Sequence, residues 1–442
     1  MSFDRGAAVA WYKRNRARSR ALFDMLPEQV YFSRPISLRH PIVFYEGHLP
    51  GFSFNTLVKK ALGQRSIDPA LEALFARGID PHESQGSGSA GLAPGWPSRD
   101  AAREFADEAD ARVLDALTRE DLDRPGDPLL DRAEAVYCIL EHEAMHQETL
   151  LYMWHRLEFD EKQAPAGYKP CVGGAAAAAE WIEIPAGRAA LGVDRSAVPF
   201  GWDNEFQACT ADVPGFSIER HNVTNARYAE FVEAGGYADE RWWRPEDWRW
   251  VQSERVEHPL FWERADDGWL WRAMFERIRL PMAWPVYVSQ AEASAYARWR
   301  GARLPSEAEY QRAAFGGPTE AIGHRTRPQP WGAAAPAAIH GVFDFSSWDP
   351  QPAGSHPAGA SAWGVEDLAG NGWEWTSSTF MPFPGFKPMA SYPEYSADFF
   401  DGEHFVMKGA SPATAHELLR PSFRNWFRAR YPYVYATFRC AK

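Results

Sequence analysis

The first third of the chain places its apolar residues with the spacing of amphipathic helices. Apolar positions recur every three or four residues in five stretches: 11–26, 54–62, 69–76, 101–117 and 129–156. Several helices of this length predict an up-down four-helix bundle. A Gly/Ser/Pro-rich stretch at residues 78–98 lies between the third and fourth helices and predicts a loop.

The pattern changes after residues 164–180, which are rich in alanine, glycine and proline and which we interpret as an interdomain linker. Beyond the linker, short β-like runs alternate with Gly, Pro and Asn, and two helical stretches interrupt them. The runs are 181–184, 188–191, 216–219 and 286–289, and the helices are 225–234 and 290–300. The sequence therefore predicts a helical domain at 1–163 and an α+β domain with long ordered loops at 181–442.

Composition narrows the classes of partner. The 442 residues include 47 Lys and Arg against 59 Asp and Glu, and the formal net charge is −12. This balance disfavours nucleic acid and anionic membranes, because both require a basic surface. The four cysteines are widely spaced and form no CxxC motif, which favours a reducing cytoplasm over a disulfide-stabilised protein. The 20 tryptophans must pack in a core or line a pocket.

Candidate chemistry first appears in the run EHEAMHQETLLYMWH of the last predicted helix. His142 and His146 stand at i and i+4, so both lie on one face and can reach a single ion. Two imidazoles suit zinc, iron, copper or nickel. Glu148 faces another side of the helix, so we expect it to hydrogen-bond to a metal ligand and not to bind the metal itself. Because Glu143 follows the first histidine, the run also satisfies the HExxH pattern of zinc metalloproteases.

A third histidine strengthens the prediction of a metal site. His48 lies in PIVFYEGHLPGF, an apolar segment of a second helical region that is predicted to end at a Pro-Gly break. Three histidines from two helices, with coordination positions left open, make a facial site of the kind that binds Fe(II) and dioxygen.

Four motifs in the second domain carry a resemblance to a known family. They are GARLPSEAEYQRAA (301–314), WGVEDLAGNGWEWTSS (363–378), PGFKPMASYPEYSADFFDG (384–402) and LLRPSFRNWF (418–427). These resemble the formylglycine-generating-enzyme, or sulfatase-modifying, domain, a C-type-lectin-like fold. The first domain, with its HxxxHxE motif, resembles the DinB-like four-helix bundle. The two domains in this order resemble the ergothioneine-type sulfoxide synthases over nearly the whole chain.

This resemblance implies a specific chemistry. The family uses non-heme Fe(II) and O2 to attach sulfur to the imidazole C2 of hercynine (trimethylhistidine), and the resemblance places the iron on the three histidines. It also implies that Tyr395 is the catalytic acid and that Asn425 and Trp426 line the site of the hercynine ammonium group. A quaternary ammonium has no N–H to donate and is held by aromatic faces. Trp373 and Trp375 are predicted to be core residues, whereas Tyr395, Trp426, Phe427 and Tyr431 are predicted to form one charge-poor aromatic pocket that faces the iron. A formylglycine-generating enzyme needs paired cysteines near its C-terminus, where only Cys440 stands.

Departures from the family pattern concern the second substrate, the chalcogen donor. Family members that use γ-glutamylcysteine carry two arginines in the loop before the third bundle helix, whereas no Arg or Lys stands between Arg77 and Arg99 here. Phe427 and Tyr431 replace an aspartate and an arginine that grip the donor, and Met145 replaces a glutamine. Each change removes a charge or an amide that a zwitterionic peptide would need.

These losses resemble the selenoneine synthase branch, which joins a selenosugar to hercynine. Hydroxyl groups at Ser87 and Ser89 would tolerate such a donor, although flexible-loop filler is the simpler explanation for both serines. Free cysteine stays open as the donor, because a small amino acid could be gripped by Arg424, Arg428 or Arg430.

Three hypotheses follow from the sequence. The main one is a C–Se bond-forming enzyme acting on hercynine and a selenosugar, in a site between the two domains. The second is the same chemistry with cysteine or γ-glutamylcysteine, giving a sulfoxide. The third is a non-catalytic lectin-like binding protein with a degenerate bundle and no iron.

Overall fold

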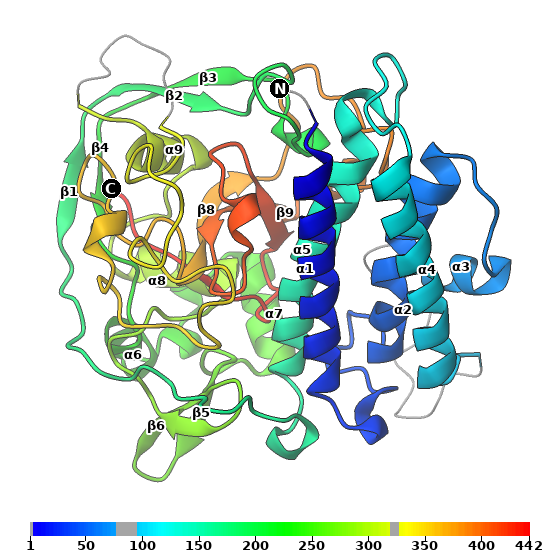
Figure 1. The fold of residues 1–442 in the computed structure, drawn as a ribbon. Coiled ribbons are helices and arrows are strands. Elements are labelled where there is room, and N and C mark those ends of the chain that lie inside the picture. Colours follow the sequence, from blue (N-terminus) through cyan, green and yellow to red (C-terminus); the bar gives the residue numbers. More distant parts are fainter. Residues whose placement is uncertain (1–2, 77–94, 319–326) are drawn as a thin grey trace. The chain divides into compact units, whose positions relative to one another are not determined.

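The computed structural model describes residues 3–76, 95–318 and 327–442. The chain forms two compact units. The helical unit comprises Met1–Tyr168 together with a short downstream segment, Met389–Pro393. The sheet unit comprises Lys169–Pro388 and Glu394–Lys442. Figure 1 shows both, coloured along the sequence.

In the described part of the helical unit there are five α-helices, with α1 packed on α5 and α2 packed on α4. Their bounds are α1 Arg5–Asp24, α2 Ile42–Ser53, α3 Pro69–Phe75, α4 Arg99–Arg119 and α5 Glu134–Trp154. Short helical turns are η1 Glu28–Val30, η3 Asp131–Ala133 and η4 Phe159–Glu161. Figure 1 shows α1, α4 and α5 as the long helices of this unit. Leu57, Val113, Val136 and Leu140 are among the side chains that fill the core between the helices.

The helix that carries His48 does not end where the sequence predicts. Helix α2 runs through Pro50 and Gly51 to Ser53, and the chain continues without a break as a π-helix, η2, at Phe54–Ala61. Proline removes an N–H and crowds the preceding turn of a helix, and wider π turns are frequent at functional sites. The predicted Pro-Gly break is therefore wrong, because burial of the whole segment outweighs the local cost of proline.

The sheet unit is built around a four-stranded sheet of order β10-β9-β8-β11. Strand β9 (His404–Ala410) pairs antiparallel with both β8 (Gly372–Thr379) and β10 (Asn425–Arg428), and β11 (Ala436–Thr437) pairs parallel with β8. Smaller sheets pair β1 Trp181–Ile184 with β4 Phe216–Glu219, β2 Gly187–Leu191 with β3 Cys209–Val213, and β5 Trp262–Ala265 with β6 Gly268–Arg272 and β7 Arg277–Arg279.

Four α-helices accompany these sheets: α6 Asn225–Glu233, α7 Pro245–Glu254, α8 Gln290–Trp299 and α9 Glu307–Phe315. Six short turns complete the unit: η5 Asp203–Glu205, η6 Gly236–Ala238, η7 Glu240–Trp242, η8 Pro357–Gly359, η9 Ala397–Phe399 and η10 His416–Leu418. The strand predicted at residues 286–289 is wrong. The N–H groups of Val286 and Val288 bond to Val223 and Ala436, but the segment joins no sheet.

A buried ion pair explains the glutamate of the GNGWEW motif. Arg439 is fully buried and binds Glu374 of β8 through two hydrogen bonds of 2.7 Å. Its remaining N–H groups donate to the backbone carbonyls of Glu219, Arg220 and Glu366. The carboxylate of the GNGWEW motif thus secures the end of the chain to the central sheet. Trp373 and Trp375 flank Glu374 in the sequence, and both are buried, which confirms their prediction as core residues.

Candidate functional site

Three histidines converge inside the helical unit. His48 comes from α2, and His142 and His146 come from successive turns of α5. One ring nitrogen from each histidine lies within 4.8 Å of the corresponding nitrogens of the other two. The i, i+4 spacing brings the α5 pair together, and the packing of α2 adds the third imidazole.

The protonation of these imidazoles suits metal binding. The Nδ1 atom of His48 lies 2.6 Å from the backbone oxygen of Phe75, at the C-terminus of α3 where carbonyls lack helical partners. The carbonyl can only accept, so Nδ1 carries the hydrogen and the lone pair remains on Nε2. Burial lowers the pKa of His48 to about 4. Burial, followed by the neighbouring histidines, also holds the pKa of His142 and of His146 well below the ordinary value.

Aromatic rings hold two of the imidazoles in place. The ring of Phe52 stacks on His142 with centroids 3.6 Å apart and an interplanar angle of 12°. Phe44 stacks on His48 at 4.7 Å and 19°. Among the described residues, none hydrogen-bonds either ring nitrogen of His142 or Nδ1 of His146. Buried nitrogens without partners require an explanation, and three neutral imidazoles converging on one point fit a divalent transition metal.

The zinc metalloprotease hypothesis fails at Glu143. Its carboxylate accepts hydrogen bonds from the Arg16 guanidinium at 2.8 Å and from the Ser19 hydroxyl at 2.7 Å, both on α1. Position 143 follows the first histidine by one residue and therefore points to a different side of α5. Glu143 secures α5 to α1, and the HExxH pattern arises from two unrelated roles on adjacent positions.

The other two predicted residues of α5 lie close to the histidines in sequence. Met145 is half-buried and Glu148 is buried. Their proposed roles, in substrate binding and in supporting a metal ligand, remain predictions.

A tyrosine that the sequence patterns did not single out lies beside the histidines. The segment Met389–Pro393 belongs to the helical unit, and its Tyr392 ring lies 6.0 Å from the ring of His142 and 5.2 Å from that of Phe52. The run SYPEY offers two tyrosines three residues apart, and the resemblance favoured Tyr395. Only the contact with His142, which is distant in the sequence, shows that Tyr392 is the tyrosine beside the histidines.

Tyr395 belongs to the sheet unit. It is buried, stacks on Trp202 at 3.9 Å and meets the edge of Trp426 at 5.1 Å. Trp426 in turn stacks on Phe380, with centroids 4.2 Å apart and planes within 5°. The structure therefore brings Tyr395 and Trp426 together, as the sequence predicts, in an aromatic group around β10.

The predicted aromatic pocket divides into two groups. Trp426 and Phe427 are consecutive on β10, so their side chains point to opposite faces of the sheet. Phe427 stacks on Tyr431 at 5.0 Å and 15°, and Tyr431 meets Tyr433 at 5.0 Å. The prediction of one pocket is therefore wrong, because the strand separates Tyr395 and Trp426 from Phe427 and Tyr431. Asn425 is half-buried, and its side-chain oxygen accepts from the N–H of Trp426.

Arg424 is committed to the fold. It is 3% exposed, and its guanidinium pairs with Glu307 at 2.8 Å and donates to the backbone carbonyls of Asn204 and Met381. The predicted grip of Arg424 on a small amino acid would require breaking this buried ion pair. Ser87 and Ser89, the other polar residues considered for the donor, lie outside the described residues.

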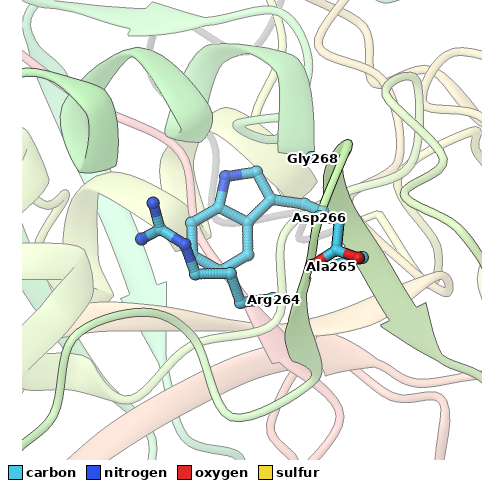
Figure 2. A pocket seen from close by; sticks show the side chains of 5 residues that line it. Arg264, Ala265, Asp266 and Gly268 are labelled. Carbon is cyan, nitrogen blue, oxygen red and sulfur yellow. The ribbon is translucent and has the colours of Figure 1, made fainter.

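A surface hollow in the sheet unit is lined by other residues. Figure 2 shows it at the turn between β5 and β6, with a volume of about 390 Å³ and a lining of Arg264, Ala265, Asp266, Gly268 and Trp269. The Arg264 guanidinium lies 5.4 Å from the centre of the Trp269 ring. Its lining contains none of the predicted site residues, so it carries no functional argument.

Comparison with known proteins assigns both halves of the chain. Residues 12–150 match the DinB superfamily, and residues 172–442 match the sulfatase-modifying factor enzyme 1-like domain. These matches and the observed helices and sheets confirm the predicted fold class. None of the helices in the described part of the chain combines the length and the apolar character needed to cross a bilayer.

Relatives share both halves. A hercynine oxygenase of Mycolicibacterium smegmatis is 39% identical over 336 residues, covering 74% of this chain and 74% of the relative. A hercynine oxygenase of Mycolicibacterium thermoresistibile is 38% identical, covering 81% of this chain and 77% of the relative. The ergothioneine biosynthesis protein 1 of Neurospora crassa is 26% identical, covering 93% of this chain and 55% of the relative.

Proposed function

The chain belongs to the ergothioneine-type sulfoxide synthase family, and from this membership we propose that it joins sulfur to the imidazole C2 of hercynine with Fe(II) and dioxygen. In this reaction the C2–H bond of hercynine and the S–H bond of a thiol break. The C–S and S–O bonds form, and the second oxygen atom of O2 leaves as water. The observation that carries the proposal is the cluster of three histidines on α2 and α5, whose pKa values burial holds below the ordinary value.

His48, His142 and His146 would hold the iron, and the partnerless nitrogens of His142 support this assignment. Bound there, iron would supply the one-electron chemistry that dioxygen needs, with open positions for O2 and the sulfur donor. The chain's own contribution begins with the Phe75 carbonyl, which keeps the hydrogen of His48 on Nδ1 and the lone pair directed to the site.

We assign the acid role to Tyr392. Reduction of dioxygen consumes protons, and the phenol must stand close to the histidines to deliver one. The ring of Tyr392 lies beside His142 within the helical unit, whereas Tyr395 packs on Trp202 and Trp426 in the sheet unit. Tyr395, the acid expected from the sequence, is instead proposed to support Trp426.

Hercynine itself carries a quaternary ammonium and a carboxylate. We propose Asn425 and Trp426 as its contacts in the sheet unit, because an aromatic face attracts a cation that cannot donate a hydrogen bond. The flat stack of Phe380 on one side of Trp426 fixes the orientation of the indole ring.

Two donors compete, and different observations favour each. Membership of the ergothioneine-type family, to which the relatives point, favours a thiol such as cysteine or γ-glutamylcysteine. The residues of this chain favour an uncharged donor such as a selenosugar, because Phe427 and Tyr431 stack on each other where family members carry an aspartate and an arginine. The aromatic pair has no charge with which to hold a zwitterion.

A donor comparison tests the function. Protein loaded with Fe(II) under anaerobic conditions is given hercynine and air with cysteine, γ-glutamylcysteine or a selenosugar, and the products are weighed by mass spectrometry. Conversion of either thiol to a sulfoxide of hercynine supports the proposal. Exclusive conversion of the selenosugar would instead show that the protein forms a C–Se bond.

Iron analysis separates both enzymes from a non-catalytic binding protein. We expect one iron per chain in the native protein and none in His142→Ala. Absence of bound iron from the native protein would favour the lectin-like alternative.

Matched tyrosine variants test the acid. Tyr392→Phe is expected to keep its iron and to lose C–S bond formation by about 100-fold, the scale of a lost general acid. Tyr395→Phe is expected to retain most of the bond-forming activity. The reverse pattern would return the acid role to Tyr395.

A further inference from the structure

The segment Met389–Pro393, here called the tyrosine strap, joins the helical unit although more than 200 residues separate it from the rest of that unit. It has no helix or strand of its own. A segment without regular structure holds a side chain in place only through contacts with its surroundings. Those contacts therefore decide where Tyr392 stands.

One face of α5 receives the strap. Glu134, Cys138 and His142 follow one another at intervals of four residues, so they line one side of the helix. The strap meets these residues in the same order. Ser391 bonds to Glu134 and to Cys138, and the next residue, Tyr392, lies beside His142.

The strongest of these contacts is the pair Glu134–Ser391. A single oxygen of the Glu134 carboxylate accepts from the Ser391 hydroxyl at 3.0 Å and from the Ser391 backbone N–H at 3.4 Å. Ser391 is buried, and hydrogen bonds to a charged acceptor are stronger than those between neutral groups. Lys60 of η2 secures the same segment by donating to the backbone oxygen of Ala390 at 2.8 Å.

We propose that the Glu134–Ser391 clasp is a positioning device that holds the Tyr392 phenol at the metal centre. This inference deepens the proposed function and rests on it. Glu134 and Ser391 touch neither substrate nor metal in this scheme. They act through the strap by fixing the residue that precedes the tyrosine.

Hydrogen exchange tests the clasp without any turnover. In the metal-free native chain the Ser391 amide is expected to be protected, and Glu134→Gln is expected to speed its exchange by about tenfold, since the charged acceptor is lost. Glu108→Gln is the matched control, because that carboxylate lies exposed on α4 and pairs with Arg112. Equal exchange in the native chain and in Glu134→Gln would overturn the clasp.

The ratio of coupled to uncoupled product tests whether the clasp positions Tyr392. Ser391→Ala and Glu134→Gln are each expected to keep stoichiometric iron, to form the hercynine product about tenfold more slowly and to oxidise more donor without coupling it to hercynine. The double variant is expected to lose less than the sum of the two single losses, because both variants weaken the same bond between the Ser391 hydroxyl and the Glu134 carboxylate. Additive losses, or an unchanged ratio of coupled to uncoupled product, would sink the positioning role.

The two proposals fail in different ways. If the native chain forms no hercynine product with any donor, the proposed function fails, and the exchange experiment still decides whether the clasp exists. If the native chain forms the hercynine product and the clasp variants give the same ratio of coupled to uncoupled product, only the inference about positioning fails.

Discussion

At the scale of single residues, the absence of a side chain at Gly47 shapes the metal centre. A Cβ atom placed at Gly47 would overlap the ring of Phe75. Phe75 packs there at the end of α3, and its carbonyl receives the hydrogen of His48. The close approach of α3 to α2 therefore sets the orientation of the first metal ligand.

We expect Gly47→Ala to lower the free energy of unfolding by about 1–3 kcal/mol, the usual cost of overpacking a core. Iron affinity is expected to fall about 10- to 100-fold, because the Phe75 carbonyl moves away from His48. Urea unfolding and iron titration measure the two effects. Gly51→Ala, on the same helix with its nearest neighbour 3.3 Å from the new Cβ, is the control. Equal iron affinity in both variants would contradict the argument.

Lys408 on β9 is a second residue whose environment is unusual. It is 3% exposed and donates to the backbone oxygens of Pro421 at 2.9 Å and Phe423 at 2.6 Å. Burial lowers its pKa to about 8. Between that value and the pKa near 10.4 of an unfolded chain, only the unfolded state keeps the proton.

The native chain should therefore become more stable relative to Lys408→Met as the pH rises from 8 to 10.4. The unfolded state binds more protons in this window, so the free energy of unfolding rises with pH, by about 3 kcal/mol in total. Urea unfolding of both proteins at pH 7, 8, 9 and 10 measures the difference. A difference that stays constant across this range would show that Lys408 titrates normally.

At the scale of elements, helix α5 carries several roles on different sides. His142 and His146 converge with His48, Glu143 binds α1, and Glu134 bonds to Ser391 of the tyrosine strap. Its position between α1 and α2 explains why most of its residues are buried. A functional motif on such a helix overlaps with positions that only support the fold.

Glu143→Gln separates these roles. The amide still accepts a hydrogen bond, but the ion pair with Arg16 is lost, so the free energy of unfolding is expected to fall by about 1–3 kcal/mol. Activity per bound iron is expected to change less than threefold, because Glu143 points to α1. A complete loss of activity with iron retained would restore a catalytic role to Glu143.

The sequence predicted elements unevenly, and the reason is physical. Amphipathic periodicity is a local signal, so helices α1, α3, α4 and α5 and strands β1 and β4 were predicted at or near their observed positions, whereas α2 was predicted only as a helical region around His48. The central strands β8 and β9 are buried along most of their length and show little alternation. Without alternation, neither strand has a period-two pattern to detect.

At the scale of the whole molecule, the chain consists of two compact units with different chemistry. The three histidines proposed to hold the metal belong to the helical unit, and Asn425 and Trp426, the proposed hercynine contacts, belong to the sheet unit. The tryptophans divide unequally. Trp11, Trp96 and Trp154 precede residue 169, and the other 17 of the 20 follow it. Tryptophan fluorescence therefore reports mainly on the sheet unit, and circular dichroism reports strongly on the helices.

Iron should stabilise the two units differently. At a free concentration 100 times its dissociation constant, iron is expected to add about 2.7 kcal/mol to the stability of the helical unit, because it binds only the folded site. Thermal melting followed by circular dichroism should shift to higher temperature, and melting followed by fluorescence should shift less. His142→Ala should show neither shift. Equal shifts by both probes in the native chain would indicate that the units melt as one.

The candidate site could be predicted in part. The i, i+4 pair His142 and His146 is visible in the sequence because one helix carries both residues, and His48 stands out as a histidine in an apolar segment. The choice between Tyr392 and Tyr395 could not be predicted. Both tyrosines stand in the same short run, and the rings that tell them apart, His142 beside Tyr392 and Trp202 beside Tyr395, lie more than 100 positions away.

The sequence by itself determined the fold class, the family and the identity of the three histidines, because motifs and periodicity are properties of neighbouring residues. The tertiary structure alone decided which tyrosine stands at the metal centre, that Glu143 and Arg424 are bound within the fold, and that Trp426 and Phe427 face opposite sides of a strand. Each of these depends on pairings between distant segments or on the pleat of a strand. A local pattern cannot specify them, since burial and hydrogen bonding are decided only when the whole chain has packed.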